Sequence, residues 1–158
     1  MTARTLSFVL HGDEILLMRR GAHKRIFPNR YNGLGGFIER NEDPWTSAKR
    51  EIQEESGLQV DHLRLVAIHH VCADPQIGIM LFVFVAHSAH AGPLKDTDEG
   101  TLEWHRLEDL SCLDLVEDLP FILPRYLHHT GQPLCATVTY DTNDHIQISY
   151  AEGGLHGE

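Results

Sequence analysis

The segment that decides the fold reads Gly36-Phe-Ile-Glu-Arg-Asn-Glu42-Asp-Pro-Trp-Thr-Ser-Ala-Lys-Arg50-Glu51-Ile52-Gln53-Glu54-Glu55-Ser56-Gly57-Leu58. Its second half predicts a helix over residues 44–56. Asp43 is a good N-cap, Pro44 is tolerated at the first helical position, and Gly57 can end a helix in a left-handed conformation. The three signals agree on where the helix begins and ends.

This helix carries an unusual concentration of negative charge. Glu51, Glu54 and Glu55 fall within a wedge about 100° wide on its surface. Like charges three and four residues apart repel, so something positive must offset them. Small, hard cations such as Mg²⁺ prefer oxygen ligands and are shared between carboxylates and substrate phosphates. The pattern therefore predicts a site for a divalent metal.

Glycines lie just upstream of the helix and allow a tight loop whose backbone can approach a ligand or metal closely: Gly33, Gly35 and Gly36. A solvated acidic helix face is the alternative interpretation of the charge run. It leaves both the glycines and Arg50 unexplained.

The segment resembles the signature of the Nudix hydrolases, and it matches that signature at every fixed position. The signature is a glycine, five residues, Glu, seven residues, Arg-Glu, an aliphatic residue, any residue, Glu-Glu, any residue, a glycine and an aliphatic residue. The resemblance implies an enzyme that cleaves a nucleoside diphosphate linked to some group X with Mg²⁺ or Mn²⁺. It also implies the metal ligands, which are three carboxylates and a main-chain carbonyl: Glu51, Glu54, Glu55 and either Gly35 or Gly36.

The resemblance assigns catalytic roles as well. Arg50 and Glu42 would form the ion pair that orients the ligands. A metal ion would neutralise phosphate oxygens and make the attacking water acidic, but the proton acceptor is left open between Glu54 and Glu99. Glu99 resembles the loop glutamate that family members bring to the metal cluster, and an inert exposed acid is the alternative for it.

Outside this segment the chain looks like the MutT-type branch, and more closely like the human-type oxidised-purine nucleoside triphosphatases. Matching residues occur in the same order: Thr5-Leu6, Met18-Arg19, residues 30–36, Glu117-Asp118 and Pro124. The implied substrate-binding residues are Thr5, Arg19, Asn32, Glu117 and Asp118. Of these, the amide and the two acids would read the purine edge, because together they can donate and accept hydrogen bonds.

One departure from that branch concerns the aromatic residue that stacks on the base. Leu115 or Val116 stands in its place, which leaves the base selectivity open. Glu117 and Asp118 also have a purely structural interpretation, as favourable acids at a helix N-terminus.

The expected function is a metal-dependent pyrophosphohydrolase that converts a nucleoside triphosphate to monophosphate and pyrophosphate, with 8-oxo-dGTP as a candidate substrate. One alternative is a hydrolase of ADP-ribose or another nucleoside diphosphate derivative. A second is a Nudix module that binds a nucleotide without turnover, as a sensor. Loss of a carboxylate from the signature would favour the sensor, and none is lost.

Composition bears on the number of domains, the class of partner and the cellular location. A chain of 158 residues suits a single domain over residues 1–158. The net charge of −10 argues against a nucleic-acid polymer as partner. The widely separated Cys72, Cys112 and Cys135 are typical of buried, reduced thiols in a cytosolic protein. With no membrane span or signal peptide expected, we expect a cytoplasmic protein, a monomer or homodimer, that acts on small nucleotides.

The rest of the chain predicts a mixed sheet between helices. Strands are expected at 6–10 and 15–18, at 63–71 and 77–86, and at 102–105, with 77–86 in the centre because it is nearly all apolar. A helical turn is expected at 107–113, a second helix at 117–129 and an added hairpin at about 135–151, beyond which residues 153–158 should fray. The order predicts an α/β/α sandwich of the Nudix type.

A basic segment, residues 19–30, lies directly before the glycines. It holds five of the chain's 13 lysines and arginines. In so acidic a protein this concentration suits the binding of a polyphosphate near the metal site. A solvated loop is the equal alternative.

Overall fold

The structure is a computed structural model that describes residues 1–151. The strands within that range are β1 (Thr2–His11), β2 (Glu14–Arg20), β3 (Tyr31–Asn32), β4 (Leu34–Phe37), β5 (Asp61–Val71), β6 (Ile79–His87), β7 (Gly100–Arg106), β8 (Leu134–Tyr140) and β9 (Ile146–Tyr150). The helices are α1 (Pro44–Ser56), the 3-10 helix η1 (Leu107–Cys112) and α2 (Leu119–Tyr126).

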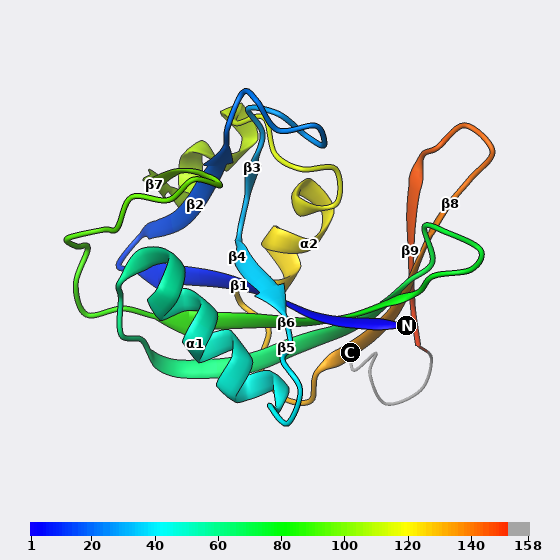
Figure 1. Ribbon diagram of the computed structural model, residues 1–158, viewed down its shortest axis with the longest axis horizontal. Helices are drawn as coiled ribbons and strands as arrows, with labels where there is room; N and C mark the ends of the chain where they lie inside the picture. The colour runs from blue at the N-terminus through cyan, green and yellow to red at the C-terminus, as the bar shows by residue number, and fades with distance from the viewer. Residues whose placement is uncertain (152–158) are drawn as a thin grey trace.

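All of these strands belong to one mixed sheet (Figure 1). Its order is β3-β2-β1-β6-β5-β8-β9, while β4 pairs with β1 and β7 pairs with β2. The pairs β1–β6 and β5–β8 are parallel and the other pairs are antiparallel. The central position predicted for the apolar strand β6 is confirmed.

The two α-helices pack on opposite faces of this sheet, as the alternation of side chains along β1 shows. Phe8 packs in a cluster with Ile122 of α2, whereas the next residue, Val9, packs in a second cluster with Ile52 of α1. Strands buried on both faces read as nearly continuous apolar runs. The predicted α/β/α sandwich is confirmed.

The ends of α1 follow from its capping residues, and the predicted bounds are confirmed. Asp43 has an extended backbone, and its carboxylate accepts hydrogen bonds from the Thr46 N–H at 2.8 Å and the Thr46 hydroxyl at 2.7 Å. Gly57 adopts a left-handed conformation with φ of 83°, and its N–H donates to the carbonyl of Gln53. These caps fix both ends of the helix that carries Glu51, Glu54 and Glu55.

The glycine segment differs from its prediction as a loop, because Leu34–Phe37 forms the strand β4 on β1. Gly35 makes this pairing possible. A Cβ at Gly35 would collide with the backbone carbonyl of Thr5. The glycine backbone is expected from the sequence to approach a ligand or metal closely; in the structure, Gly35 closely approaches the backbone of β1.

The second helix is shorter than predicted: α2 spans Leu119–Tyr126, whereas the sequence predicts a helix over 117–129. At its start, the Leu119 N–H bonds to the carbonyl of Val116 in a turn, which leaves residues 117 and 118 ahead of the helix. At its other end, the helix continues two residues past Pro124, which lacks a backbone N–H, and the Leu127 N–H caps it on the carbonyl of Leu123.

The C-terminal hairpin is present as β8 and β9, beginning one residue before the predicted range, and β8 extends the sheet beside β5. The expected burial of the thiols is wrong for Cys112 and Cys135, which are exposed. The expectation for residues 153–158 lies outside the described residues. No helix within residues 1–151 has both the length and the apolar character needed to cross a membrane.

Candidate active site

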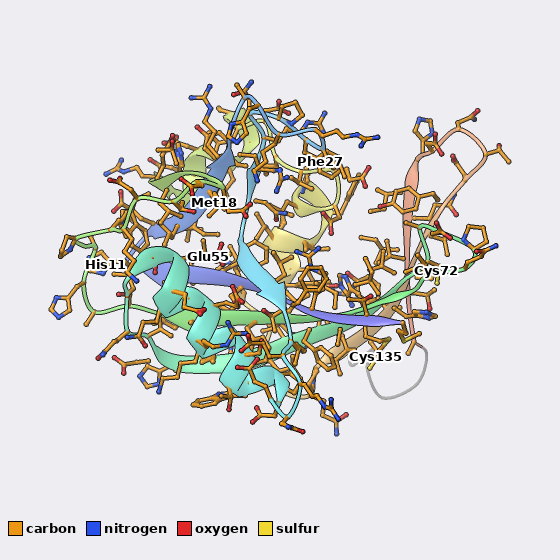
Figure 2. All side chains as sticks on the ribbon, viewed as in Figure 1. His11, Met18, Phe27, Glu55, Cys72 and Cys135 are labelled. Atoms are coloured by element: carbon orange, nitrogen blue, oxygen red, sulfur yellow. The ribbon has the colours of Figure 1, made fainter. Side chains whose placement is uncertain are left out.

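A cavity of about 740 Å³ connects α1, the glycine segment, the start of α2 and the C-terminal hairpin. Glu55 on α1 and Phe27 in the loop between β2 and β3 both line it (Figure 2). Among the described residues, the acidic side chains in its lining are Glu39, Glu51, Glu55, Glu99, Glu117 and Asp118. Arg4 and Arg20 line it as well. The cavity is thus rich in carboxylates that come from four separate parts of the chain.

Glu55 is held at the junction of α1 and the glycine segment. Its Oε1 accepts a hydrogen bond from the Gly35 N–H at 2.9 Å. Burial raises the pKa of this carboxyl to about 7, and the negative charges of Glu51, Glu99 and Glu54 act in the same direction. A bound cation would favour the ionised form of such a group.

Glu51 lies directly against the backbone of Gly36. A Cβ at Gly36 would stand 2.7 Å from the carboxyl group of Glu51, closer than real Cβ contacts. Only glycine therefore lets this carboxylate and the main chain share the space. Glu51 and Glu55 bring carboxylate oxygens beside the backbone of the glycine segment, and this is the donor chemistry that suits Mg²⁺.

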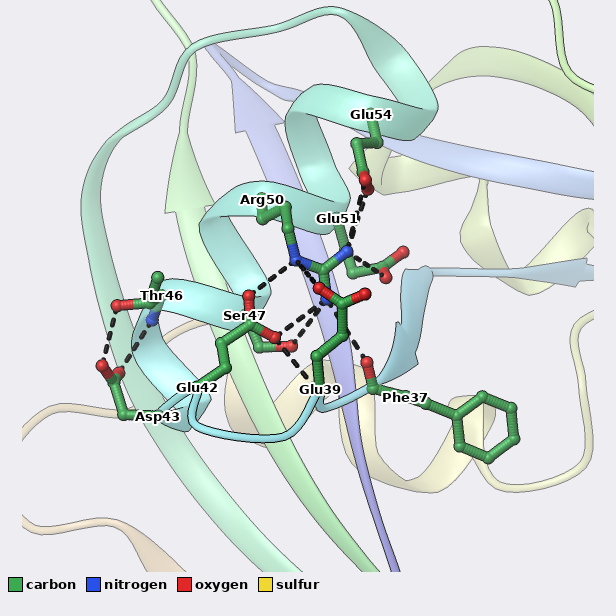
Figure 3. A network of polar contacts seen from close by, with 9 residues as sticks. All are labelled: Phe37, Glu39, Glu42, Asp43, Thr46, Ser47, Arg50, Glu51 and Glu54. Atoms are coloured by element: carbon green, nitrogen blue, oxygen red, sulfur yellow. Dashed lines mark hydrogen bonds and ion pairs between the residues drawn. The ribbon is translucent and has the colours of Figure 1, made fainter.

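Arg50 forms the centre of an ion-pair network on α1 (Figure 3). Its guanidinium binds both carboxylate oxygens of Glu42, at 2.6 and 2.9 Å, and donates to Glu51 and Glu54 at 2.9 Å each. The hydrogen bond from Arg50 lowers the pKa of Glu42 to about 2. The Arg50–Glu42 ion pair expected from the resemblance is present.

The structure does not gather all the expected metal ligands. Within residues 1–151, no group of three or more His, Cys, Asp or Glu side chains lies close enough to hold one ion. Glu54 is exposed and pairs with Arg50, and it is not among the residues of 1–151 that line the cavity. The Arg50 guanidinium binds both Glu51 and Glu54, but of the two only Glu51 also lines the cavity.

The loop acid Glu99 does reach the cavity. It precedes β7, lines the same space as Glu51 and Glu55, and its charge contributes to the raised pKa of Glu55. Its own carboxylate forms an ion pair of 3.1 Å with Lys24.

Four of the five expected substrate-binding residues line the cavity: Thr5, Asn32, Glu117 and Asp118. Within the described structure, the buried hydroxyl of Thr5 has no hydrogen-bond partner. Asn32 Oδ1 accepts from the Gly33 N–H at 2.8 Å. Burial, reinforced by the charge of Glu117, raises the pKa of Asp118 to about 6.

Arg19, the fifth of these residues, does not reach the described lining of the cavity. It is exposed on β2, whereas Arg20 lines the cavity. Side chains alternate along a strand, so Arg20 shares the face of Met18, which also lines the cavity. The period of two could have identified Arg20 from the sequence.

Sequence reasoning also missed three aromatic residues in the lining. Tyr140 on β8 donates a hydrogen bond of 2.6 Å to Glu117, Phe27 comes from the basic segment, and Phe37 ends β4. Leu115 is buried in the core and Val116 lines the cavity. Aromatic surface is therefore available from other segments than the one expected, and no local spacing in the sequence signals it.

Comparison with known proteins agrees with this geometry. Residues 1–126 match the NUDIX domain family. The chain is 32% identical over 152 residues to the oxidized purine nucleoside triphosphate hydrolase of Mus musculus, which covers 93% of this chain and 91% of the relative. It is 28% identical to the uncharacterized Nudix hydrolase YvcI of Bacillus subtilis (strain 168), over 87% of this chain and 85% of that protein.

A solved structure points the same way. The MutT protein from Bacillus halodurans superimposes with a TM-score of 0.78 at 26% sequence identity, over 96% of this chain and 97% of that one. The family match covers well over half of the chain, and the mouse and Bacillus halodurans proteins extend over nearly all of it. The chain belongs to the NUDIX family and is a MutT-like hydrolase of phosphoric anhydride bonds.

Proposed function

We propose that residues 1–158 form one catalytic domain that converts a purine nucleoside triphosphate to monophosphate and pyrophosphate with a divalent metal, and that 8-oxo-dGTP is a candidate substrate. One observation carries the proposal. Glu51 and Glu55, beside the glycine segment, share a single cavity with the acids and the amide that suit a purine edge. The mouse relative is named for hydrolysis of oxidized purine nucleoside triphosphates.

The two ends of the cavity suit the two parts of such a substrate. At the α1 end, Glu51 and Glu55 would hold Mg²⁺ or Mn²⁺, which neutralises non-bridging phosphate oxygens and acidifies the attacking water. Glu99 lines the cavity and Glu54 does not. This difference favours Glu99 as the proton acceptor, because an acceptor must reach the water it deprotonates.

The other end offers both donors and acceptors to a base. Asn32 uses its oxygen for the Gly33 N–H, so its NH₂ group is free to donate to a purine acceptor. Glu117 accepts a hydrogen bond from the Tyr140 hydroxyl. Asp118, with a raised pKa, can carry a proton and donate it in a hydrogen bond. This combination fits a guanine-like edge.

A panel of nucleotides with Mg²⁺ tests the proposal. The panel contains 8-oxo-dGTP, dGTP, dATP and ADP-ribose, and chromatography measures monophosphate and pyrophosphate. We expect the highest kcat/KM for a purine triphosphate, since only this ratio measures discrimination. A higher kcat/KM for ADP-ribose would contradict the substrate class. Binding without turnover of any compound would contradict the enzyme and indicate a sensor.

A matched pair of variants ties the activity to the cavity. Glu55→Gln removes a charge beside Gly35, whereas Glu108→Gln removes one from an exposed ion pair with Arg106. We expect turnover to fall at least about 100-fold in the first variant and to stay at the wild-type value in the second. Equal activity of the two variants would place the reaction elsewhere.

A further inference from the structure

We propose that Lys24 controls the position of Glu99. In the absence of substrate its ammonium group holds the Glu99 carboxylate, and a bound polyphosphate then takes the ammonium over and releases Glu99 toward the metal-binding carboxylates. The inference rests on the proposed function, because it requires a substrate that carries several phosphates.

The contact itself is well defined. Lys24 Nζ lies 3.1 Å from Glu99 Oε2, and the two side chains are 26% and 55% exposed. Glu99 lines the cavity, and so do Ile26 and Phe27, two and three residues after Lys24. The ion pair therefore lies where the basic segment, residues 19–30, meets the cavity lined by Glu51, Glu55 and Glu99.

Main-chain hydrogen bonds bring the two partners together. The Gly21 N–H donates to the carbonyl of Glu99 at 3.1 Å, and β2 pairs with β7 as far as Arg20 opposite Gly100. The Lys24 N–H donates back to the carbonyl of Gly21 at 3.0 Å, which closes a turn. Because the backbone fixes both segments, the ion pair can exchange partners without any movement of the fold.

Other cations around the cavity already have partners of a different kind. Arg20 donates through Nε to the carbonyl of Ile26 at 2.9 Å, and the guanidinium of Arg4 stacks over Phe37 at 4.5 Å. Lys24 is paired instead with a half-exposed carboxylate, and such pairs contribute little stability. A compact ammonium on a flexible stem can readily move to a polyphosphate with more negative charge.

The exchange has a consequence for the acids. Glu99 lines the same cavity as Glu51 and Glu55. Once Lys24 has moved to the phosphates, no other described residue forms an ion pair with Glu99. A metal ion held by Glu51 and Glu55 is then the cation to which its carboxylate can turn. The substrate would then complete the site on which it is cleaved.

Metal binding without nucleotide tests the first half of the proposal. Lys24→Ala frees Glu99, so we expect this variant to bind Mn²⁺ about two- to five-fold more tightly than wild type at low salt, the size of an exposed ion pair. Electron paramagnetic resonance of free Mn²⁺ gives the affinity. Equal or weaker binding by Lys24→Ala would overturn the proposal.

Kinetics test the second half. With saturating Mg²⁺, we expect Lys24→Ala to raise KM for the nucleoside triphosphate about two- to five-fold and to leave kcat within a factor of two. Lys24→Arg should preserve both constants. An unchanged KM would show that Lys24 does not transfer to phosphate. A residue that only supported the fold would not tighten Mn²⁺ binding while weakening nucleotide binding.

Two controls isolate the contact. Arg106→Ala breaks another exposed ion pair of 3.1 Å, with Glu108, and should change neither Mn²⁺ affinity nor KM. The double variant Lys24→Ala/Glu99→Gln should lose the gain in Mn²⁺ affinity, because no carboxylate remains to be released. A gain that persists there would also overturn the proposal. Thermal melts check folding, and Lys24→Gln replaces Lys24→Ala if the alanine variant unfolds.

The result can be separated from that of the proposed function. If wild type hydrolyses no nucleotide, the proposed function fails, yet Mn²⁺ affinity still decides whether Lys24 restrains Glu99. Calorimetry with a non-hydrolysable nucleoside triphosphate then replaces KM as the measure of transfer.

Discussion

Tyr140 donates a hydrogen bond of 2.6 Å to the carboxylate of Glu117, and this contact joins the C-terminal hairpin to the start of α2 beside the cavity. Tyr140→Phe removes the donor and leaves the ring. A hydrogen bond to a charged group contributes roughly 1.5–3 kcal/mol, so we expect kcat/KM for a purine triphosphate to fall by about 10- to 100-fold. Steady-state kinetics with the preferred nucleotide measure the loss.

Tyr150→Phe is the matched control for this change. Tyr150 lies in the same hairpin, but its hydroxyl pairs with that of Tyr126 rather than with a cavity residue. It should lower the melting temperature slightly and leave kcat/KM unchanged. A similar loss of kcat/KM in both variants would mean that the hairpin, and not the Glu117 contact, supports recognition.

A second prediction concerns the contact between Gly36 and Glu51. The Cβ of Gly36→Ala would displace the Glu51 carboxylate, because it would stand less than 3 Å from the carboxylate atoms. We expect Mn²⁺ affinity and turnover to fall at least about ten-fold, in keeping with the sensitivity of metal sites to small changes around their ligands. Calorimetry with Mn²⁺ measures this directly.

Gly57→Ala provides the comparison for that variant. Gly57 has φ of 83°, and a Cβ there would meet the Lys95 side chain rather than a carboxylate, so alanine there should cost about 1–3 kcal/mol of unfolding free energy. Metal affinity at 25 °C should remain at the wild-type value. If Gly57→Ala weakened Mn²⁺ binding as much as Gly36→Ala, general destabilisation would explain both results.

The parts of the fold that depend on local signals could be predicted from the sequence. Asp43, Pro44 and Gly57 define the ends of α1 through interactions with their own neighbours. The unbroken apolar run of β6 predicts burial on both faces. These features need no knowledge of what packs against them.

The features that depend on contacts between distant segments could not be predicted in this way. The partner of Tyr140 is 23 residues away in the chain, and only the packing of β8 brings the two side chains together. Arg50 lies within reach of several carboxylates, and spacing alone does not show that it holds Glu54 away from the cavity. The resemblance predicts Arg19 as a substrate-binding residue, whereas strand periodicity favours Arg20, which lines the cavity.

A third prediction concerns Glu54, which is a metal ligand or base by resemblance and a partner of Arg50 in the structure. Glu54→Gln should reduce turnover at least about 100-fold if its carboxylate serves the reaction. The melting temperature should change little, because exposed ion pairs contribute only about 0–1 kcal/mol. Undiminished turnover in this variant would assign Glu54 a purely structural pairing with Arg50.

A fourth prediction follows from the pKa of Glu55, which burial raises to about 7 from the usual 4.5 of a glutamate. Between these values the folded protein holds a proton that the unfolded chain releases. The contribution of Glu55 to the unfolding free energy is therefore fully present below about pH 4.5 and is lost as the pH rises through about 7.

Glu55→Gln resembles the protonated form, so the variant should match wild type at pH 4 and be more stable than wild type at pH 8 in metal-free buffer. Urea denaturation at both pH values measures the difference in unfolding free energy between variant and wild type. Other titrating groups contribute equally to both proteins and cancel, including His69, whose burial lowers its pKa to about 4. Addition of Mg²⁺ should reverse the order at pH 8, because the cation stabilises the ionised carboxylate of wild type. If wild type remained the more stable protein at pH 8 in the presence of a chelator, Glu55 would already be compensated by a positive charge of the protein.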